Sequence, residues 1–358
     1  MAVAVGPMAG KVTRSRTGEG GRPTGRSAAC AYHRWVSDAE QNDRSARRFA
    51  AGAKVGVKLD GVRSGAQRWR DYEVELSDRR SLGVAEFGPE DGFPVLWFHG
   101  TPGARHQIPP AAVEHAHTAG VRIIGVERPG VGKSTPHHYG RIIDSADDIR
   151  QLIDQLGLDR IGLIGLSGGG PYVLAVCSQL PDRVAAAAVL GGVAQSAGPE
   201  RVPGGMVPVL RWFHPVLGYV REPVATVMSV GLRAVAPVAD CVFDLYMKLG
   251  PRSDREFLAR PEMRRMFIDD LINSGRTGFR AVAYDAVLFS RWWGFDVSQI
   301  QTPIYLWHGD DDLVVPLTHG KRMAAMIPNA SLSVVPGKGH LAMLDAAEEA
   351  IDLILTHR

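Results

Sequence analysis

The stretch Ile161-Gly-Leu-Ile-Gly-Leu-Ser-Gly-Gly-Gly170 decides the fold of this chain. Its apolar part is typical of a buried strand, and Gly165-Leu166-Ser167-Gly168-Gly169 fits the pattern G-x-S-x-G. In this pattern a serine occupies a sharp turn between a strand and a helix, so the residues two before and two after it must be small. The turn lifts the hydroxyl above the sheet and points the N-terminus of a helix at it. The stretch therefore predicts a reactive serine at one edge of an α/β sheet.

Short apolar runs alternate with helical segments on both sides of this turn. Before it, a predicted hairpin opens the pattern, and each later strand is followed by a helix. The predicted strands are Tyr72–Leu76, Leu82–Phe87, Val95–Phe98, Val121–Val126, Ile161–Leu166, Val184–Leu190, Ile304–Trp307 and Leu332–Val335. The predicted helices are Ala111–Ala119, Ile143–Leu156, Gly170–Leu180, Leu317–Met326 and Leu341–Leu355. Apolar strands alternating with helices indicate an α/β fold, with a parallel sheet covered on both faces.

Two segments depart from this alternation and define the predicted domains. Residues 1–70 have little hydrophobic periodicity and are predicted to be a disordered basic N-terminal extension. Residues 196–295 contain proline-rich turns and helical stretches rich in large apolar side chains. We expect them to form a helical cap, inserted between the two parts of an α/β core at 71–195 and 296–358.

Charge and cysteine content limit the classes of function. Residues 1–70 carry 14 Lys and Arg against 5 Asp and Glu, whereas the rest of the chain has a net charge of −6. A mildly acidic globule argues against nucleic acid as a partner. The three widely spaced cysteines favour a reducing compartment, and we expect a cytoplasmic protein. No apolar run is long enough to span a membrane, so the expected partner is a small-molecule substrate; the oligomeric state is left open.

A serine that attacks an acyl group needs a general base and an acid that orients the base. Among the histidines beyond Ser167, His340 is our candidate base, because it follows the last predicted strand on a glycine-rich loop. The sequence Gly309-Asp-Asp-Asp312 directly follows another strand and supplies the acid. Asp312 is the preferred acid and Asp310 is the rival. Three adjacent carboxylates also suit a divalent cation, but the sequence has no second ligand cluster, so no metal is expected.

The charge that develops on an attacked carbonyl oxygen needs two backbone N–H donors. One is Gly168, the residue after the serine, and Thr101 in the loop His99-Gly-Thr-Pro-Gly103 is the predicted second donor. His99 is interpreted as a residue that orients this loop. Glu127-Arg128, after the next strand, is interpreted as an internal ion pair or a brace for its own loop.

Together, HGTPG (99–103), ERPGVGKS (127–134), GLSGGG (165–170), HGDDDLVVP (308–316) and GKGH (337–340) resemble the α/β-hydrolase-fold superfamily, of the capped serine esterase or prolyl-iminopeptidase-like type. The resemblance covers the two core segments and implies an eight-stranded, mostly parallel sheet, a Ser–His–Asp triad and no cofactor. Ser167 argues against epoxide hydrolases and haloalkane dehalogenases of this fold, which use an aspartate nucleophile.

The predicted function is a serine hydrolase that cleaves carboxylic esters of a small to medium apolar substrate through an acyl-enzyme. Ser167, His340 and Asp312 are the expected catalytic residues, and Thr101 and Gly168 the expected oxyanion hole. The alternatives on the same triad are an aminopeptidase, a carbon–carbon bond hydrolase and a cofactor-free perhydrolase. A small-ligand receptor with slow turnover is the alternative from a different class.

Overall fold

The computed structural model describes residues 57–60, 69–197, 250–274 and 280–358. All of them belong to one compact unit, Asp43–Arg358. Within these described ranges, none of the helices combines the length and the apolar composition that crossing a membrane requires.

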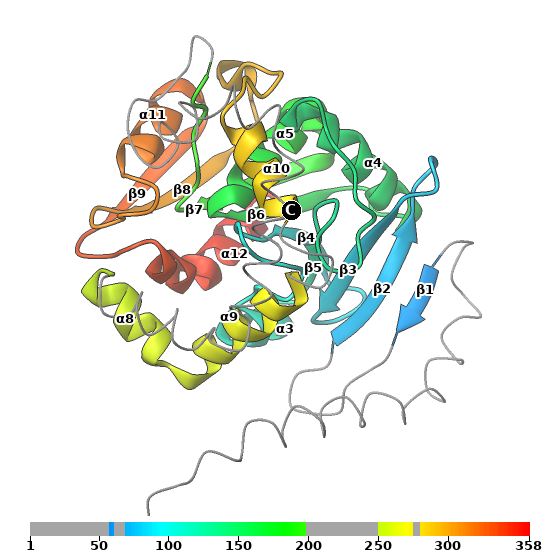
Figure 1. Ribbon diagram of the computed structural model, residues 1–358, viewed down its shortest axis with the longest axis horizontal. Coiled ribbons are helices and arrows are strands. Elements are labelled where there is room, and N and C mark those ends of the chain that lie inside the picture. Colours follow the sequence, from blue (N-terminus) through cyan, green and yellow to red (C-terminus); the bar gives the residue numbers. More distant parts are fainter. Residues whose placement is uncertain (1–56, 61–68, 198–249, 275–279) are drawn as a thin grey trace, which may run out of the picture. The chain divides into compact units, whose positions relative to one another are not determined.

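A single mixed sheet forms the centre of the described structure (Figure 1). Its strand order is β1-β2-β3-β5-β4-β6-β7-β8-β9. The strands are β1 Val57–Asp60, β2 Trp69–Glu75, β3 Ser81–Phe87, β4 Phe93–Phe98, β5 Val121–Val126, β6 Ile161–Leu166, β7 Val184–Leu190, β8 Ile304–Gly309 and β9 Ala330–Val335. The pairs from β5 through β9 are parallel, and the pairs that join β1, β2, β3 and β5 are antiparallel. Strands β2–β9 are the expected eight-stranded, mostly parallel sheet.

Strand β1 is a ninth strand that the sequence pattern did not predict. It lies inside the range 1–70, which was predicted to be disordered, and Trp69 and Arg70 of β2 also fall in that range. Val57 pairs with Val74 and Asp60 pairs with Asp71. Strand β1 can form because the backbone of β2 offers an open edge for pairing. The sequence did not predict it because a strand of four residues is too short to give a periodic hydrophobic signal. Residues 1–56 and 61–68 of the predicted extension lie outside the described residues.

Helices cover both faces of the sheet, because its central strands are apolar on both sides. On β4, Leu96 and Phe98 pack in one core cluster, while Val95 and Trp97 pack in the other. The first cluster includes side chains from α4 Ser145–Gln155, α5 Gly170–Gln179 and α11 Thr318–Met326. The second includes side chains from α3 Pro110–Thr118 and α12 Ala347–Leu355. The predicted helix Leu341–Leu355 is in fact two elements, since a 3-10 helix, η6 Leu341–Ala346, precedes α12.

The sheet also fixes where a site can form. The chain runs from β4 to β5 on one side of β4, and β6 then pairs on the other side. In open α/β sheets the strand order reverses at such a point, and the loops that follow the strands separate there to leave a crevice. The loops after β4, β6, β8 and β9 carry all the candidate site residues.

The described part of the predicted insertion is helical. It contains α8 Arg252–Ala259, α9 Pro261–Ser274 and α10 Arg280–Phe289. Residues 198–249 and 275–279 of the insertion lie outside the described residues. The limits of the cap therefore stay a prediction.

Candidate active site

Ser167 has the backbone geometry that the G-x-S-x-G pattern predicts. Its φ is 51°, in the left-handed region that non-glycine residues rarely adopt. The neighbouring glycines are required by close packing. A Cβ on Gly165 would lie 2.7 Å from a side-chain carbon of Val173, and a Cβ on Gly169 would collide with the carbonyl oxygen of Phe98. The turn is thus held in a conformation that only this arrangement of small residues permits.

The structure brings the three predicted catalytic side chains together in one hydrogen-bonded chain. His340 Nε2 lies 2.8 Å from Ser167 Oγ, and His340 Nδ1 lies 2.7 Å from Asp312 Oδ2. All three residues are buried, with Ser167 retaining 8% of its surface exposed. Gly191, at the end of β7, leaves room for the imidazole: a Cβ there would lie 3.3 Å from His340 Nδ1. This arrangement lets His340 accept the serine proton while Asp312 fixes the ring.

Asp312 and Asp310 have different surroundings, although they are two residues apart. Asp312 is buried, and its Oδ1 accepts hydrogen bonds from the backbone N–H groups of Val314 and Val315, at 2.9 and 2.8 Å. Asp310 is exposed and accepts from the N–H of Gly337 at 2.6 Å. The carboxylate of Asp312 therefore faces His340, and that of Asp310 holds a turn.

The other candidate histidines of the described residues have other hydrogen-bond partners, although His308 Nε2 lies 3.6 Å from Asp312 Oδ2. His308 Nε2 donates to the carbonyl of Val315 at 2.7 Å, and burial lowers the pKa of His308, which keeps its ring neutral. His319 Nδ1 accepts from a backbone N–H at 3.0 Å, and His357 Nε2 lies 2.8 Å from the hydroxyl of Tyr305. His214 lies outside the described residues.

The loop after β4 is held by its own histidine, as predicted. His99 is fully buried, its Nδ1 donates to the carbonyl of Gly100 at 2.7 Å, and its Nε2 accepts from the N–H of Arg128 at 3.3 Å. Burial, together with the charge of Arg128, lowers the pKa of His99 well below its usual value. A neutral ring with both nitrogens occupied is a structural brace. Thr101 and Gly168 are neighbours, since a Cβ on Gly168 would collide with Thr101 Oγ1.

Glu127 and Arg128 each brace a loop, but they do so through separate partners. Glu127 is fully buried and accepts from Arg105 Nη1 at 2.5 Å and from the N–H of Lys133 at 2.7 Å. Arg128 pairs with Asp285 of α10 at 2.9 Å.

The insertion supplies a contact to His340 that sequence reasoning missed. Asp254 of α8 is fully buried, and its two carboxylate oxygens accept from the N–H groups of His340, at 3.0 Å, and of Ala342, at 2.9 Å. Its neighbour Ser253 accepts from the N–H of Gly339 at 2.8 Å. Asp254 therefore caps the start of η6 and fixes the backbone of the candidate base.

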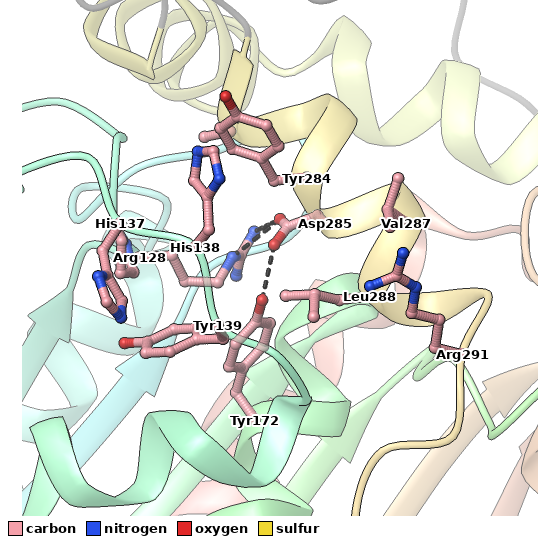
Figure 2. Close-up of a pocket in the computed structure, with 12 residues that line it drawn as sticks. Arg128, His137, His138, Tyr139, Tyr172, Tyr284, Asp285, Val287, Leu288 and Arg291 are labelled. Atoms are coloured by element: carbon pink, nitrogen blue, oxygen red, sulfur yellow. Dashed lines mark hydrogen bonds and ion pairs between the residues drawn. The ribbon is translucent and has the colours of Figure 1, made fainter. Parts of the chain in front are cut away.

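Asp285, also missed, had one signal in the sequence: it is the single charged residue in the apolar run 281–289. A buried carboxylate in such a run needs donors. Figure 2 shows its bonds to Arg128 and Tyr172 at the wall of a pocket. The rings of Tyr139 and Tyr284 also line this pocket. Ser167, His340 and Asp312 are not among the residues that line it.

The adjacent carboxylates of residues 310–312 raised the question of a cation. Within the part of the chain that the structure describes, no group of three or more His, Cys, Asp or Glu side chains is arranged to hold a metal ion.

Comparison with known proteins gives a consistent result. A family profile described as the alpha/beta hydrolase fold matches residues 94–347. The protein 2-hydroxy-6-oxononadienedioate/2-hydroxy-6-oxononatrienedioate hydrolase 2 of Pseudomonas putida is 29% identical over 241 residues, 66% of this chain and 77% of that protein. Poly(3-hydroxyalkanoate) depolymerase of Ectopseudomonas oleovorans is 26% identical over 285 residues, 79% and 90% of the two chains. The crystal structure of an esterase from Rhodococcus sp. ECU1013 matches with a TM-score of 0.59, covering 81% of this chain and 99% of that one; at 20% identity this likeness shows the fold alone.

Proposed function

The chain belongs to the α/β-hydrolase fold family, and from that premise we propose that it is a serine hydrolase that cleaves carboxylic esters of small to medium apolar substrates. The observation that carries the proposal is the hydrogen-bonded chain Ser167–His340–Asp312, with contacts of 2.8 and 2.7 Å. The names of the relatives, a hydrolase and a depolymerase, support hydrolysis as the class of reaction.

In the proposed first half-reaction, Ser167 Oγ attacks the acyl carbon while its proton moves to His340 Nε2. The carbonyl oxygen becomes an oxyanion, which the N–H groups of Thr101 and Gly168 stabilise. When the tetrahedral intermediate collapses, the bond to the alcohol breaks and the leaving oxygen takes the proton from His340. The alcohol departs and Ser167 stays acylated.

In the second half-reaction, His340 accepts a proton from water, and the hydroxide attacks the acyl carbon. Collapse of the second intermediate releases the carboxylic acid and returns the proton to Ser167. Asp312 keeps the Nδ1–H of His340 in place throughout and stabilises the imidazolium. Its two backbone N–H bonds keep the carboxylate fixed during this cycle.

An apolar substrate is supported by an aromatic side chain close to Gly168. Phe289 at the end of α10 is buried, and its Cζ lies 3.0 Å from the position that a Cβ on Gly168 would occupy. An aromatic ring beside the reacting carbonyl favours an apolar acyl or alcohol group over a charged one.

The test is hydrolysis of p-nitrophenyl esters from acetate to decanoate by the wild type and by Ser167→Ala. We expect turnover by the wild type and a loss of about 10³-fold or more in the variant, because the nucleophile is absent. The acyl chain length that gives the highest kcat/KM measures the space available beside Phe289. An ester hydrolysis rate that Ser167→Ala leaves unchanged, or no turnover of any ester by folded wild type, would contradict the proposal.

A further inference from the structure

Each described helix of the insertion places one buried carboxylate on a loop that carries a candidate site residue. Asp254 of α8 holds the backbone of the loop after β9. Asp270 of α9 accepts from an N–H of the loop 99–104 at 2.6 Å. Asp285 of α10 reaches the same loop and has the largest set of donors. None of the three lies in the core segments, so the insertion contributes to the architecture of the site.

Asp285 gathers donors from three separate parts of the chain. Its Oδ2 accepts from Thr101 Oγ1 at 2.8 Å. Figure 2 shows the other two bonds, from Arg128 Nε to Oδ2 at 3.0 Å and from the hydroxyl of Tyr172 to Oδ1 at 2.7 Å. The guanidinium of Arg128 lies over the ring of Tyr172, at 5.0 Å from its centre. Tyr172 belongs to α5, the helix that begins just after Ser167. One carboxylate thus joins the loop after β4 to the helix that carries the serine turn.

The bonds of Arg128 determine how the peptide before Thr101 is oriented. Arg128 Nη2 donates to the carbonyl of Gly100 at 2.8 Å and to Thr101 Oγ1 at 2.7 Å, and its Nη1 donates to the carbonyl of His99 at 2.6 Å. The carbonyl of Gly100 and the N–H of Thr101 belong to one planar peptide unit and point in opposite directions. Fixing that carbonyl toward Arg128 therefore fixes the Thr101 N–H away from it.

We propose that Asp285 is a positioning residue, which sets the direction of the Thr101 N–H in the oxyanion hole by holding both Arg128 and the Thr101 hydroxyl. The proposal rests on the proposed function, because it assigns the Thr101 N–H to a developing oxyanion. Asp285 itself does not touch the reacting atoms.

A carboxylate is required at this position on electrostatic grounds. Arg128 is only 6% exposed, and a buried guanidinium without a counter-charge is strongly unfavourable. An amide at position 285 has one oxygen and one NH₂ group, so it cannot accept from Thr101, Arg128 and Tyr172 at once. Without the carboxylate, Arg128 is drawn toward solvent or another acceptor, and the carbonyl of Gly100 loses one of its two donors, Arg128, while it keeps His99 Nδ1.

The first test compares Asp285→Asn and Thr101→Val, alone and combined, with p-nitrophenyl butyrate as the substrate. We expect each single variant to lower kcat by about 10- to 100-fold, because a misplaced oxyanion donor acts on the transition state. The KM of each variant should stay within about twofold of the wild-type value. The kcat of the double variant should lie within about twofold of the kcat of the slower single variant. A trifluoromethyl ketone, whose adduct places an oxyanion in the same hole, should lose affinity in parallel with kcat/KM.

Asp148→Asn is the matched control. Asp148 of α4 is buried and accepts from Arg80, at 2.7 Å to both oxygens, and from the hydroxyl of Tyr139 at 2.6 Å. It therefore has an arginine and a tyrosine donor, as Asp285 does, but no contact with the loop 99–104. This variant should lose thermal stability and keep its kcat.

Hydrogen exchange of the peptide covering residues 99–104 provides a readout that needs no turnover. Asp285→Asn should exchange faster in this peptide than wild type, and Asp148→Asn should not. Unchanged exchange in Asp285→Asn overturns the proposal whatever the kinetics show. Faster exchange with unchanged kcat, or an equal loss of kcat in Asp148→Asn, also overturns it. If wild type hydrolyses no ester, the proposed function fails, and the exchange result alone decides whether Asp285 holds the loop.

Discussion

Oδ2 of Asp312 lies 2.7 Å from Nδ1 of His340, and Oδ1 of the same carboxylate is occupied by two backbone N–H groups. The carboxylate therefore cannot rotate away without losing three hydrogen bonds. The neighbouring Asp310 has no such role, since it faces the turn at Gly337. This contrast leads to the first prediction.

Asp312→Asn should lower kcat by about 10³- to 10⁴-fold, because an amide at this position selects the wrong imidazole tautomer and gives no charge to stabilise the imidazolium. Asp310→Asn should change kcat by less than about tenfold, since it perturbs only the turn at Gly337. Steady-state hydrolysis of one p-nitrophenyl ester by both variants measures the difference. Equal losses of kcat in the two variants would contradict the assignment of Asp312 as the acid of the triad.

Asp254→Ala should reduce both stability and turnover. It leaves the buried N–H groups of His340 and Ala342 without acceptors, which costs about 2–5 kcal/mol of unfolding free energy. The loop that carries His340 then loses its fixed position, so kcat falls as well. Glu256→Gln is the control, because Glu256 lies on the same helix and pairs with Arg252 at the surface. Chemical denaturation and ester hydrolysis, compared across the two variants, test this; a stable and active Asp254→Ala would refute it.

Gly169→Ala should prevent correct folding of the serine turn. The added methyl group would overlap the carbonyl oxygen of Phe98, which is backbone and cannot move aside. We expect the free energy of unfolding to fall by more than about 3 kcal/mol, as in other cases where an added group overlaps atoms of a packed interior. Gly140→Ala is the matched control, because the one atom near its Cβ is Asp144 Oδ2 at 3.2 Å, the end of a side chain. Thermal unfolding of the two variants gives the comparison, and similar melting temperatures would count against the packing argument.

The pH dependence of stability should contain a contribution from Asp270. Burial raises the pKa of this carboxyl from 3.8 to about 7, partly opposed by the N–H of Ala104 and the charge of His106, and increased by the charge of Glu127. A carboxyl whose folded pKa is raised binds more protons in the folded than in the unfolded state between these two values. The contribution of Asp270 to the free energy of unfolding is therefore fully present below about pH 4 and is lost as the pH rises to about 7.

Asp270→Asn mimics the protonated acid and keeps an acceptor for Ala104. We expect its melting temperature to exceed that of wild type at about pH 8 and to match it at about pH 4, because the variant does not lose stability over this range. Differential scanning calorimetry at the two pH values measures this. A melting-temperature difference that does not change with pH would show that Asp270 is not the titrating group.

Local and long-range features differ in how far the sequence could predict them. The strands around Ser167 are apolar runs of ordinary length, so their positions follow from hydrophobic pattern alone. The order of serine, acid and histidine along the chain, each after a strand, also predicted which side chains meet. In contrast, β1 is four residues long and has no periodic signal of its own.

The buried aspartates were not predictable for a different reason. Asp254, Asp270 and Asp285 bond to partners that lie 86, 166 and 184 residues away in the chain. A single acid in an amphipathic helix is usually solvated, and of the three only Asp285, in the apolar run 281–289, had a local signal of burial. Such pairings depend on how the insertion packs on the core, which a one-dimensional pattern does not encode.

The three aspartates also define how this protein can be re-engineered. Inserted segments are natural targets for changing substrate preference, because they can vary while the core stays intact. In this chain the helices α8, α9 and α10 hold the loops of the candidate base and of Thr101, so replacing the whole insertion would remove supports of the candidate site. A combinatorial library should therefore randomise Phe289, which lies beside Gly168, and keep the three carboxylates unchanged.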